Sequence, residues 1–324
     1  MKLRMTATIA MALWGAMSSI ASAEFDNVTL QMAHIYNPGE HWGDVADDFK
    51  ARVEEASGGT VKINISPSGT TGDWPQSIEG LKIGTNDIVL QSVGALDRYG
   101  SIAGIEAFPY LLRDVGHFEA FYYGPVGAEV FDAIEEQTGF HLIGASYRGA
   151  RHLSANREAG TLEQLAGLKL RVPPLKMYRE TWENLGASPV PMGFAEVFTS
   201  LQHGLIDGQE NPLEVIQNVS LYEVQDYVME TGHVMGAMTF IFNGARFDQL
   251  SADTQTLLKE AGEAAMKAGT ERMIATEADL KANLQEKGMT FIEVDKKAFA
   301  AKLDGYAKEF PDLEPWVEKI QAIE

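Results

Sequence analysis

The sequence predicts an α/β protein built from two units, and three observations lead to this fold class. Strand and helix patterns alternate through the first half of the chain, and the same alternation resumes in the second half. The length of 324 residues suits two domains of roughly 100–200 residues each. The apolar fraction of 45% is enough to bury a substantial core. Because single helices separate the strands, we expect right-handed crossovers and a largely parallel sheet.

The first half contains a helix between two strands. Trp42, Val45, Phe49 and Val53 recur at helical spacing, which predicts a helix over residues 41–57 that a Gly-Gly pair ends. The following segment, TVKINIS, alternates with period two and predicts a strand. The elements expected here are strands over residues 28–36, 60–66 and 87–92, the helix over 41–57 and a short helix ending at Leu81.

The second half repeats the pattern and then becomes mostly helical. The elements expected are helices over residues 125–137, 177–185 and 194–203 and strands over 140–147 and 168–172. An Ala/Glu/Lys-rich stretch runs from Ser251 to about Gly288. No flexible linker divides the two units, so we expect the boundary at a crossing strand near residues 147–151 and discontinuous pieces in each unit.

The first 23 residues have the pattern of a signal peptide. Lys2 and Arg4 precede an apolar run, and Ala21-Ser22-Ala23 offers a small-x-small cleavage site. A retained membrane anchor is the alternative, but the apolar run is short against the roughly 20 residues that a span needs. We therefore expect an exported, soluble mature chain from Glu24 to Glu324.

The composition excludes several function classes. The net charge is −20, and removal of Lys2 and Arg4 gives −22 for the mature chain (−20 − 2), which argues against binding to nucleic acids and anionic membranes. There is no cysteine, so disulfides, a thiolate nucleophile and cysteine-metal sites are excluded. An anionic ligand would need local positive charge to bind this acidic protein.

Arg171 is the first candidate for such a charge. It lies in GLKLRVPP, at the carboxyl end of a predicted strand, where open α/β sheets bind their ligands. Its guanidinium group can hold a carboxylate through two parallel hydrogen bonds. The alternative is a strand-end arginine paired with a surface glutamate, and position alone favours that alternative.

A second source of positive charge precedes it. Arg148, Arg151 and Arg157 cluster in YRGARHLSANR, although the composition does not tell which of them points inward. Asn211, before Pro212, could donate to and accept from a ligand carboxylate, or simply start a helix. Most of the aromatic residues suit a core.

Motifs for catalysis and for metal binding are missing from the sequence. G-x-S-x-G, H-E-x-x-H, G-x-x-x-x-G-K-[ST] and G-x-G-x-x-G do not occur. The seven histidines are scattered, and His34 with His41 is the closest pair. We therefore expect neither an enzyme nor a cofactor or metal.

These residues are also where the chain resembles a known family, the periplasmic solute receptors of tripartite ATP-independent periplasmic (TRAP) transporters. The resemblance covers nearly the whole mature chain and is densest in GLKLRVPP, GASPVPMGFAEVFTSLQHGLIDGQENP and FDQLSADTQTLLKEA. It implies a two-lobed periplasmic-binding-protein-like clamp, each lobe a mostly parallel sheet flanked by helices, with crossing strands and a long helix between the lobes. The divisions expected are a signal peptide at residues 1–23, lobe I at 24–148 plus about 237–276, and lobe II at 149–236 plus about 277–324.

The resemblance also implies a set of ligand-binding residues. The carboxylate-binding arginine of the family falls on Arg171 through the LRVP motif, and a second arginine falls on Arg151. The asparagine of the Q-E-N-P motif falls on Asn211, and a pocket-wall aromatic falls on Phe194. The positions where the other lobe contacts the rest of the ligand are His34, Trp74, Gln76, Gln91 and Ser92.

The implied ligand is a small organic acid, delivered in the periplasm to integral membrane subunits of a TRAP transporter. Sialic-acid receptors of the family carry a glutamate and an arginine at the positions of Ser92 and Ala95, so sialate is not expected here. The polar candidates suit a ligand with several hydroxyl groups and so favour a sugar acid, such as a uronate or aldonate. One carboxylate is expected, because the segments expected to line lobe I contain no lysine or arginine to hold a second one. A C4-dicarboxylate or a simpler carboxylate is the alternative ligand.

Two other classes of function remain open. A secreted hydrolase acting on sugar acids would need a positioned nucleophile or acid–base pair, and the sequence offers no motif for one. A sensor subunit that docks on a membrane kinase would bind the same ligands with a different partner.

Overall fold

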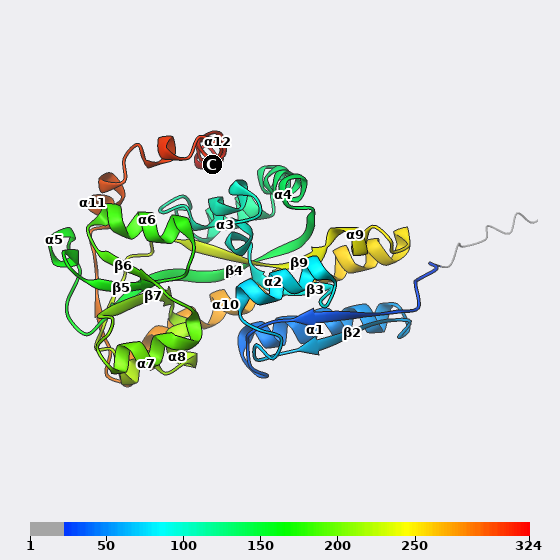
Figure 1. Cartoon of the computed structure of the whole chain (residues 1–324), viewed down its shortest axis with the longest axis horizontal. Helices are drawn as coiled ribbons and strands as arrows, with labels where there is room; N and C mark the ends of the chain where they lie inside the picture. Colours follow the sequence, from blue (N-terminus) through cyan, green and yellow to red (C-terminus); the bar gives the residue numbers. More distant parts are fainter. Residues whose placement is uncertain (1–22) are drawn as a thin grey trace, which may run out of the picture.

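The structure is a computed structural model, and it describes residues 23–324. Residues 1–22 of the predicted signal peptide lie outside the described residues. The elements form one elongated molecule with two groups of strands and helices at opposite ends of its long axis (Figure 1). This arrangement agrees with the α/β fold class that the sequence predicts.

The first group forms from the amino-terminal part of the chain. Its elements are β1 (Val28–Ala33), α1 (His41–Ala56), β2 (Val61–Ser66), α2 (Trp74–Ile83) and β3 (Ile88–Ser92). The strands are parallel, with β1 between β2 and β3. Trp42, Val45, Phe49 and Val53 of α1 are completely buried, which confirms the predicted apolar face.

The second group has the same design. Its elements are α5 (Leu162–Leu165), β5 (Lys169–Val172), α6 (Lys176–Leu185), β6 (Ser188–Pro191), α7 (Val197–Gln202), β7 (Gly208–Pro212) and α8 (Leu213–Asn218). β5 pairs in parallel with both β6 and β7. The helix predicted over residues 194–203 is a 3-10 turn at Phe194–Glu196 followed by the short α7. Asn211 lies in a strand and not at a helix start.

Two long strands join the groups. β4 (Phe140–Ala155) pairs antiparallel with β7 at its far end, and β9 (Met235–Asn243) lies between β3 and β4. The sheet order is β2-β1-β3-β9-β4-β7-β5-β6, so parallel pairs flank an antiparallel centre. β4 is longer than the strand predicted over residues 140–147, and the sequence did not predict β9. Both strands are almost entirely buried, so neither shows the polar-apolar alternation of a half-buried strand.

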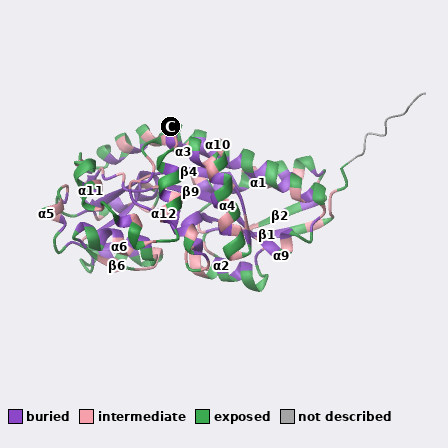
Figure 2. Cartoon of the chain, turned by 90° about the horizontal axis from the view of Figure 1, so that it is seen from above, coloured by how far each residue is buried: buried purple, intermediate pink, exposed green. Residues whose placement is uncertain are grey.

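Helices complete the structure. They are α3 (Val115–Tyr122), α4 (Pro125–Thr138), α9 (Gly244–Phe247), α10 (Ala252–Glu286), α11 (Lys296–Lys302) and α12 (Glu314–Gln321), and a small parallel pair joins β8 (Tyr227–Met229) to β10 (Thr290–Ile292). α10 packs on β4 and α1 and runs along the molecule from one group to the other (Figure 1). Ser251 caps it by accepting a hydrogen bond from the Thr254 amide. Buried and exposed residues alternate along α1 and α10, as expected for helices that cover a core (Figure 2).

Candidate functional site

A cleft of about 550 Å³ lies where the crossing strand β4 meets both groups of elements. Its wall includes side chains from α2, β4, β5, β7 and α8, together with residues of the loops that follow β1, β2 and β5. Of the candidates from the sequence, six line the cleft: Trp74, Gln76, Arg151, Arg171, Phe194 and Asn211. The structure therefore brings together residues that lie up to 137 positions apart in the sequence (211 − 74).

Arg171 lies at the end of β5 and is only 3% exposed. Its Nε and Nη2 atoms donate to the Met192 carbonyl oxygen at 3.0 and 2.8 Å, which fixes one edge of the guanidinium group. The Phe194 ring lies 5.7 Å from Cζ. Within residues 23–324 no carboxylate forms a salt bridge with it, so the edge bearing Nη1 is left for a ligand. The glutamate partner considered as the alternative is not found among the residues that the structure describes.

Burial is the main influence on the charge of Arg171. It lowers the pKa to about 10, and repulsion from Arg151 and Arg148 acts in the same direction, whereas Glu210 opposes it. The group remains a cation at neutral pH but has lost most of its hydration. An anion in the cleft would offset the free-energy cost of this lost hydration, because a desolvated charge gains most from a hydrogen-bonded counterion.

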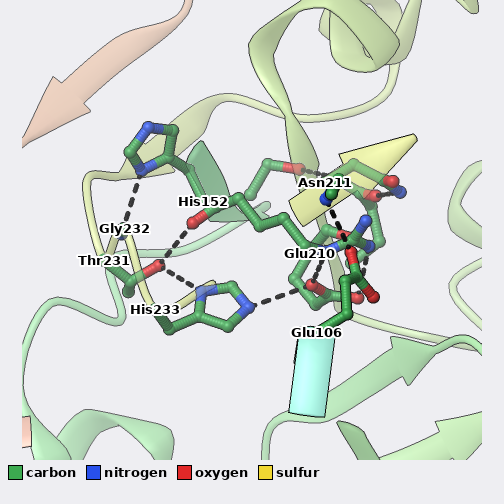
Figure 3. A network of polar contacts seen from close by, with 11 residues as sticks. Glu106, His152, Glu210, Asn211, Thr231, Gly232 and His233 are labelled. Carbon is green, nitrogen blue, oxygen red and sulfur yellow. Dashed lines mark hydrogen bonds and ion pairs between the residues drawn. The ribbon is translucent and has the colours of Figure 1, made fainter. Parts of the chain in front are cut away.

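Arg151 differs from Arg171 because it has a partner within the protein. Its Nε and Nη2 atoms donate to the Glu210 carboxylate at 2.6 and 2.7 Å, and Nη2 also reaches the Glu210 carbonyl oxygen at 2.7 Å. His233 lies 3.0 Å from the same carboxylate and 2.9 Å from the Thr231 hydroxyl, as Figure 3 shows. Arg151 lines the cleft, but only Nη1 is without a hydrogen bond to residues 23–324.

The Glu210 carboxyl group responds to these neighbours. Burial raises its pKa, but Arg151 and His233 more than offset burial and lower the pKa to about 2. The pair is therefore ionised in the physiological range, and the carboxylate shields the ligand side of the cleft from much of the charge of Arg151.

Asn211 and the aromatic candidates complete the part of the site that the sequence predicted. Asn211 Nδ2 donates to the Gln209 side chain at 2.6 Å, which orients its Oδ1 atom. Trp74 begins α2, where Asp73 accepts a hydrogen bond from the Trp74 amide at 2.7 Å. Phe194 and Trp74 thus stand on different sides of the cleft, on the second and first groups of elements.

His34, Gln91 and Ser92 are buried and are not among the residues that line the cleft. The His34 Nδ1 atom accepts a hydrogen bond from the Tyr36 amide at 3.2 Å. The Gln91 side chain donates to the Trp74 carbonyl oxygen at 3.1 Å and to the Ser77 hydroxyl. Their contact with a ligand therefore stays a prediction.

Arg148 is the cleft residue that the sequence left unassigned. It is 5% exposed, and its guanidinium carbon lies 5.0 Å above the Trp74 ring. In a regular strand, residues three apart point to opposite faces, so Arg148 and Arg151 would not share a wall. The pairing of β4 with β9 gains one extra residue between Tyr147 and Ala150, and Gly149 adopts φ +86° there. This bulge brings both arginines to the cleft.

Glu214 also lines the cleft and was not predicted. It is the second residue of α8, is 6% exposed, and accepts a hydrogen bond from the Asn218 side chain at 2.7 Å. Burial raises its pKa to about 7, and Arg148 opposes that rise. The wall therefore contains a carboxyl group that changes charge near neutral pH.

Two features are absent from the part of the chain that the structure describes, residues 23–324. No group of three or more His, Asp or Glu side chains there could hold a metal ion. No helix there is long and apolar enough to cross a membrane.

The fold and the cleft define a two-lobed α/β solute-binding protein. The family model of bacterial extracellular solute-binding protein family 7 matches residues 32–312, and the chain belongs to this family. A solute-binding protein of Roseobacter denitrificans is 33% identical over 305 residues, which cover 94% of this chain and 93% of that protein. The sialic acid-binding periplasmic protein of Vibrio cholerae is 29% identical and covers 98% of both chains.

Solved structures agree with this assignment. A TRAP periplasmic solute-binding protein of Roseobacter denitrificans with bound L-galactonate has a TM-score of 0.85 and 31% identity, over 92% of this chain and 99% of that one. A second one from the same organism, with bound β-D-glucuronate, has a TM-score of 0.87 and 25% identity, over 92% and 100%. The resemblance to TRAP solute receptors, and with it the two-lobed fold, is thereby confirmed.

Proposed function

We propose that this chain captures a sugar acid, a uronate or an aldonate, in the periplasm and delivers it to the membrane subunits of a TRAP transporter. The observation that carries the proposal is Arg171, a buried arginine that faces the cleft with one guanidinium edge free. The Roseobacter relatives with galactonate and glucuronate support the ligand class, since both ligands combine one carboxylate with several hydroxyl groups.

Each cleft residue has a role in the proposal. Arg171 holds the carboxylate, and the Nη1 atom of Arg151 and the Oδ1 atom of Asn211 assist it. Phe194 and Trp74 provide the walls, and Gln76 binds hydroxyl groups at the rim. His34, Gln91 and Ser92 are proposed to touch the ligand only after a rearrangement, because they do not line the cleft.

A sialate ligand is not part of the proposal, although the Vibrio cholerae relative binds sialic acid. Ala95 lines the cleft in this chain and offers only a methyl group. A sialic acid has a bulky side chain that needs polar partners of its own, since unpaired polar groups are costly when buried.

We further propose that the lobes, residues 24–148 with about 237–276 and residues 149–236 with about 277–324, close on the ligand. A ligand that both lobes contact favours the closed state by its differential affinity for that state. Small-angle scattering should show a smaller radius of gyration for the saturated protein than for the free protein. Identical profiles would contradict closure.

A competition series tests the ligand class. Glucuronate, galacturonate, gluconate, succinate, malate and fumarate are titrated against the mature protein by calorimetry, and the sugar acids are expected to bind most tightly. Submicromolar binding of the C4-dicarboxylates with silent sugar acids would contradict the ligand class and leave the transport role standing. Ligand recovered unchanged after long incubation supports a receptor, and conversion of the sugar acid would contradict it.

A further inference from the structure

Arg148 has a side chain for which residues 23–324 provide no hydrogen-bond partner. Its Nε atom is buried without one, and no hydrogen bond or salt bridge is formed by its terminal nitrogens. The buried Nε atom costs free energy, because it has given up water without a replacement, whereas the terminal nitrogens are left to bind a ligand. The stacking on Trp74, at 5.0 Å, offsets part of that cost.

Two buried carboxyl groups, Glu106 and Glu214, could in principle serve as partners, because the charge of Arg148 acts on both. Neither, however, has an oxygen within 4.0 Å of the Arg148 nitrogens. Glu106 instead accepts a hydrogen bond from the Ala237 amide at 3.1 Å, and Glu214 accepts one from Asn218 at 2.7 Å. Arg148 is therefore held near these groups by the strand and not by ion pairing.

The placement of Arg148 complements that of Arg171. Each guanidinium group lies over an aromatic ring, Trp74 on α2 for Arg148 and Phe194 on the second group of elements for Arg171. Both line the same cleft of about 550 Å³, which is large enough for a six-carbon acid. Since Arg151 is neutralised by Glu210, the cleft contains two buried arginines without a carboxylate partner in the described chain.

We propose that Arg148 forms a second anion-binding subsite and that this protein prefers sugar diacids, with carboxylates at both ends, over the corresponding monoacids. The inference rests on the proposed function and extends its ligand class from uronates and aldonates, which carry one carboxylate, to the corresponding diacids. Arg171 takes one carboxylate and Arg148 the other, with the hydroxyl-bearing carbons between them. The expectation of a single carboxylate depended on lobe I segments that contain no lysine or arginine. The bulge at Gly149 brings Arg148, which lies outside those segments, to the cleft.

Matched pairs of open-chain acids test the subsite. Galactarate and galactonate share their hydroxyl configuration and differ only at the terminal carbon, as do glucarate and gluconate. We expect wild-type protein to bind each diacid at least about tenfold more tightly than its monoacid, because only the diacid gives Arg148 a charged hydrogen-bond partner.

The Arg148→Gln variant should remove this preference by weakening diacid binding about tenfold more than monoacid binding, since glutamine keeps polarity but not charge. Arg148→Lys keeps a charge and should retain part of the preference for diacids. If the glutamine variant does not fold, the ratio of diacid to monoacid affinity in the lysine variant still tests the subsite. Arg157→Gln, an exposed arginine outside the cleft, is the matched control and should change nothing.

The outcomes separate the subsite from the function. Wild-type protein that binds the monoacids with no preference for the diacids contradicts the subsite alone. Equal weakening of both acids by Arg148→Gln assigns Arg148 a structural role and overturns the inference as well. Wild-type protein that binds none of the four acids contradicts the proposed function itself.

Discussion

Two buried arginines of the cleft wall, Arg151 and Arg171, have the same charge and nearly the same exposure, 2% and 3%, but different partners. Arg151 belongs to a closed network with Glu210 and His233, in which most of its donors are used. Arg171 is held by one backbone carbonyl and keeps an edge open to the cleft. Burial of an arginine therefore does not by itself identify a ligand site. A ligand site is indicated where the buried arginine has no carboxylate partner within the protein.

The largest effect expected from this comparison comes from breaking the closed network. Glu210→Gln leaves Arg151 buried without its counterion, which should lower the free energy of unfolding by about 3–5 kcal/mol. Urea unfolding at pH 7 measures the loss. If the variant is as stable as wild type, Arg151 does not depend on Glu210 and the network is not structural.

The same network predicts a pH dependence. The folded pKa of Glu210, about 2, is below its unfolded value of 4.5, so its stabilisation is present above about pH 4.5 and is lost as the pH falls towards 2. The difference in stability between wild type and Glu210→Gln should therefore shrink over that range.

Glu214 should show the opposite dependence, because its folded pKa of about 7 lies above the unfolded value of 4.5. The folded state holds the proton more tightly, so wild-type stability falls relative to Glu214→Gln as the pH rises from about 4.5 through 7. The expected change is about 2–4 kcal/mol, at 1.36 kcal/mol for each pH unit. Urea titrations of both proteins at pH 4.5, 6 and 8 measure it, and a constant difference would contradict the assignment.

For the open arginine the effect is on binding. Arg171→Lys keeps the charge but loses the planar two-point contact, so affinity for the sugar acid should fall by about 1–3 kcal/mol, or roughly 5- to 150-fold. Calorimetry measures the affinity, and the unfolding midpoint should barely move. Arg179→Lys, on the exposed side of α6, is the control. Unchanged affinity for Arg171→Lys would refute its role.

The smallest effect concerns the bulge that brings Arg148 and Arg151 to one wall. Gly149→Ala places a side chain at φ +86° with its Cβ 3.3 Å from Pro212, which should cost about 1–2 kcal/mol of stability and also weaken binding. Gly58→Ala, at φ +60° with open space around it, should cost similar stability without affecting binding. Equal binding by both variants would show that the bulge does not position the arginines.

The sequence predicted most of the elements because their patterns are local. The apolar face of α1 and the alternation in β2 follow directly from side-chain spacing. β9 was missed because a strand buried on both faces has no alternation to detect.

The resemblance predicted six of the residues that line the cleft. It did not predict which of the arginines there have a carboxylate partner within the protein. LRVP locates Arg171, but no local pattern tells that Glu210 neutralises Arg151 or that Arg148 faces the cleft. Those facts depend on the pairing of β4 with β7 and on a register shift against β9, which are long-range features. The sequence offered one indication of the bulge, which is the glycine between Arg148 and Arg151 in a strand that is almost entirely buried.

The structure of the protein with a bound sugar acid tests the central claim most directly. The account predicts a ligand carboxylate within hydrogen-bond distance, about 2.7–2.9 Å, of the free edge of Arg171. In the same complex, the pair of Arg151 and Glu210 remains intact. A carboxylate held instead by the Nε and Nη2 atoms of Arg151, with Glu210 displaced, would contradict the account.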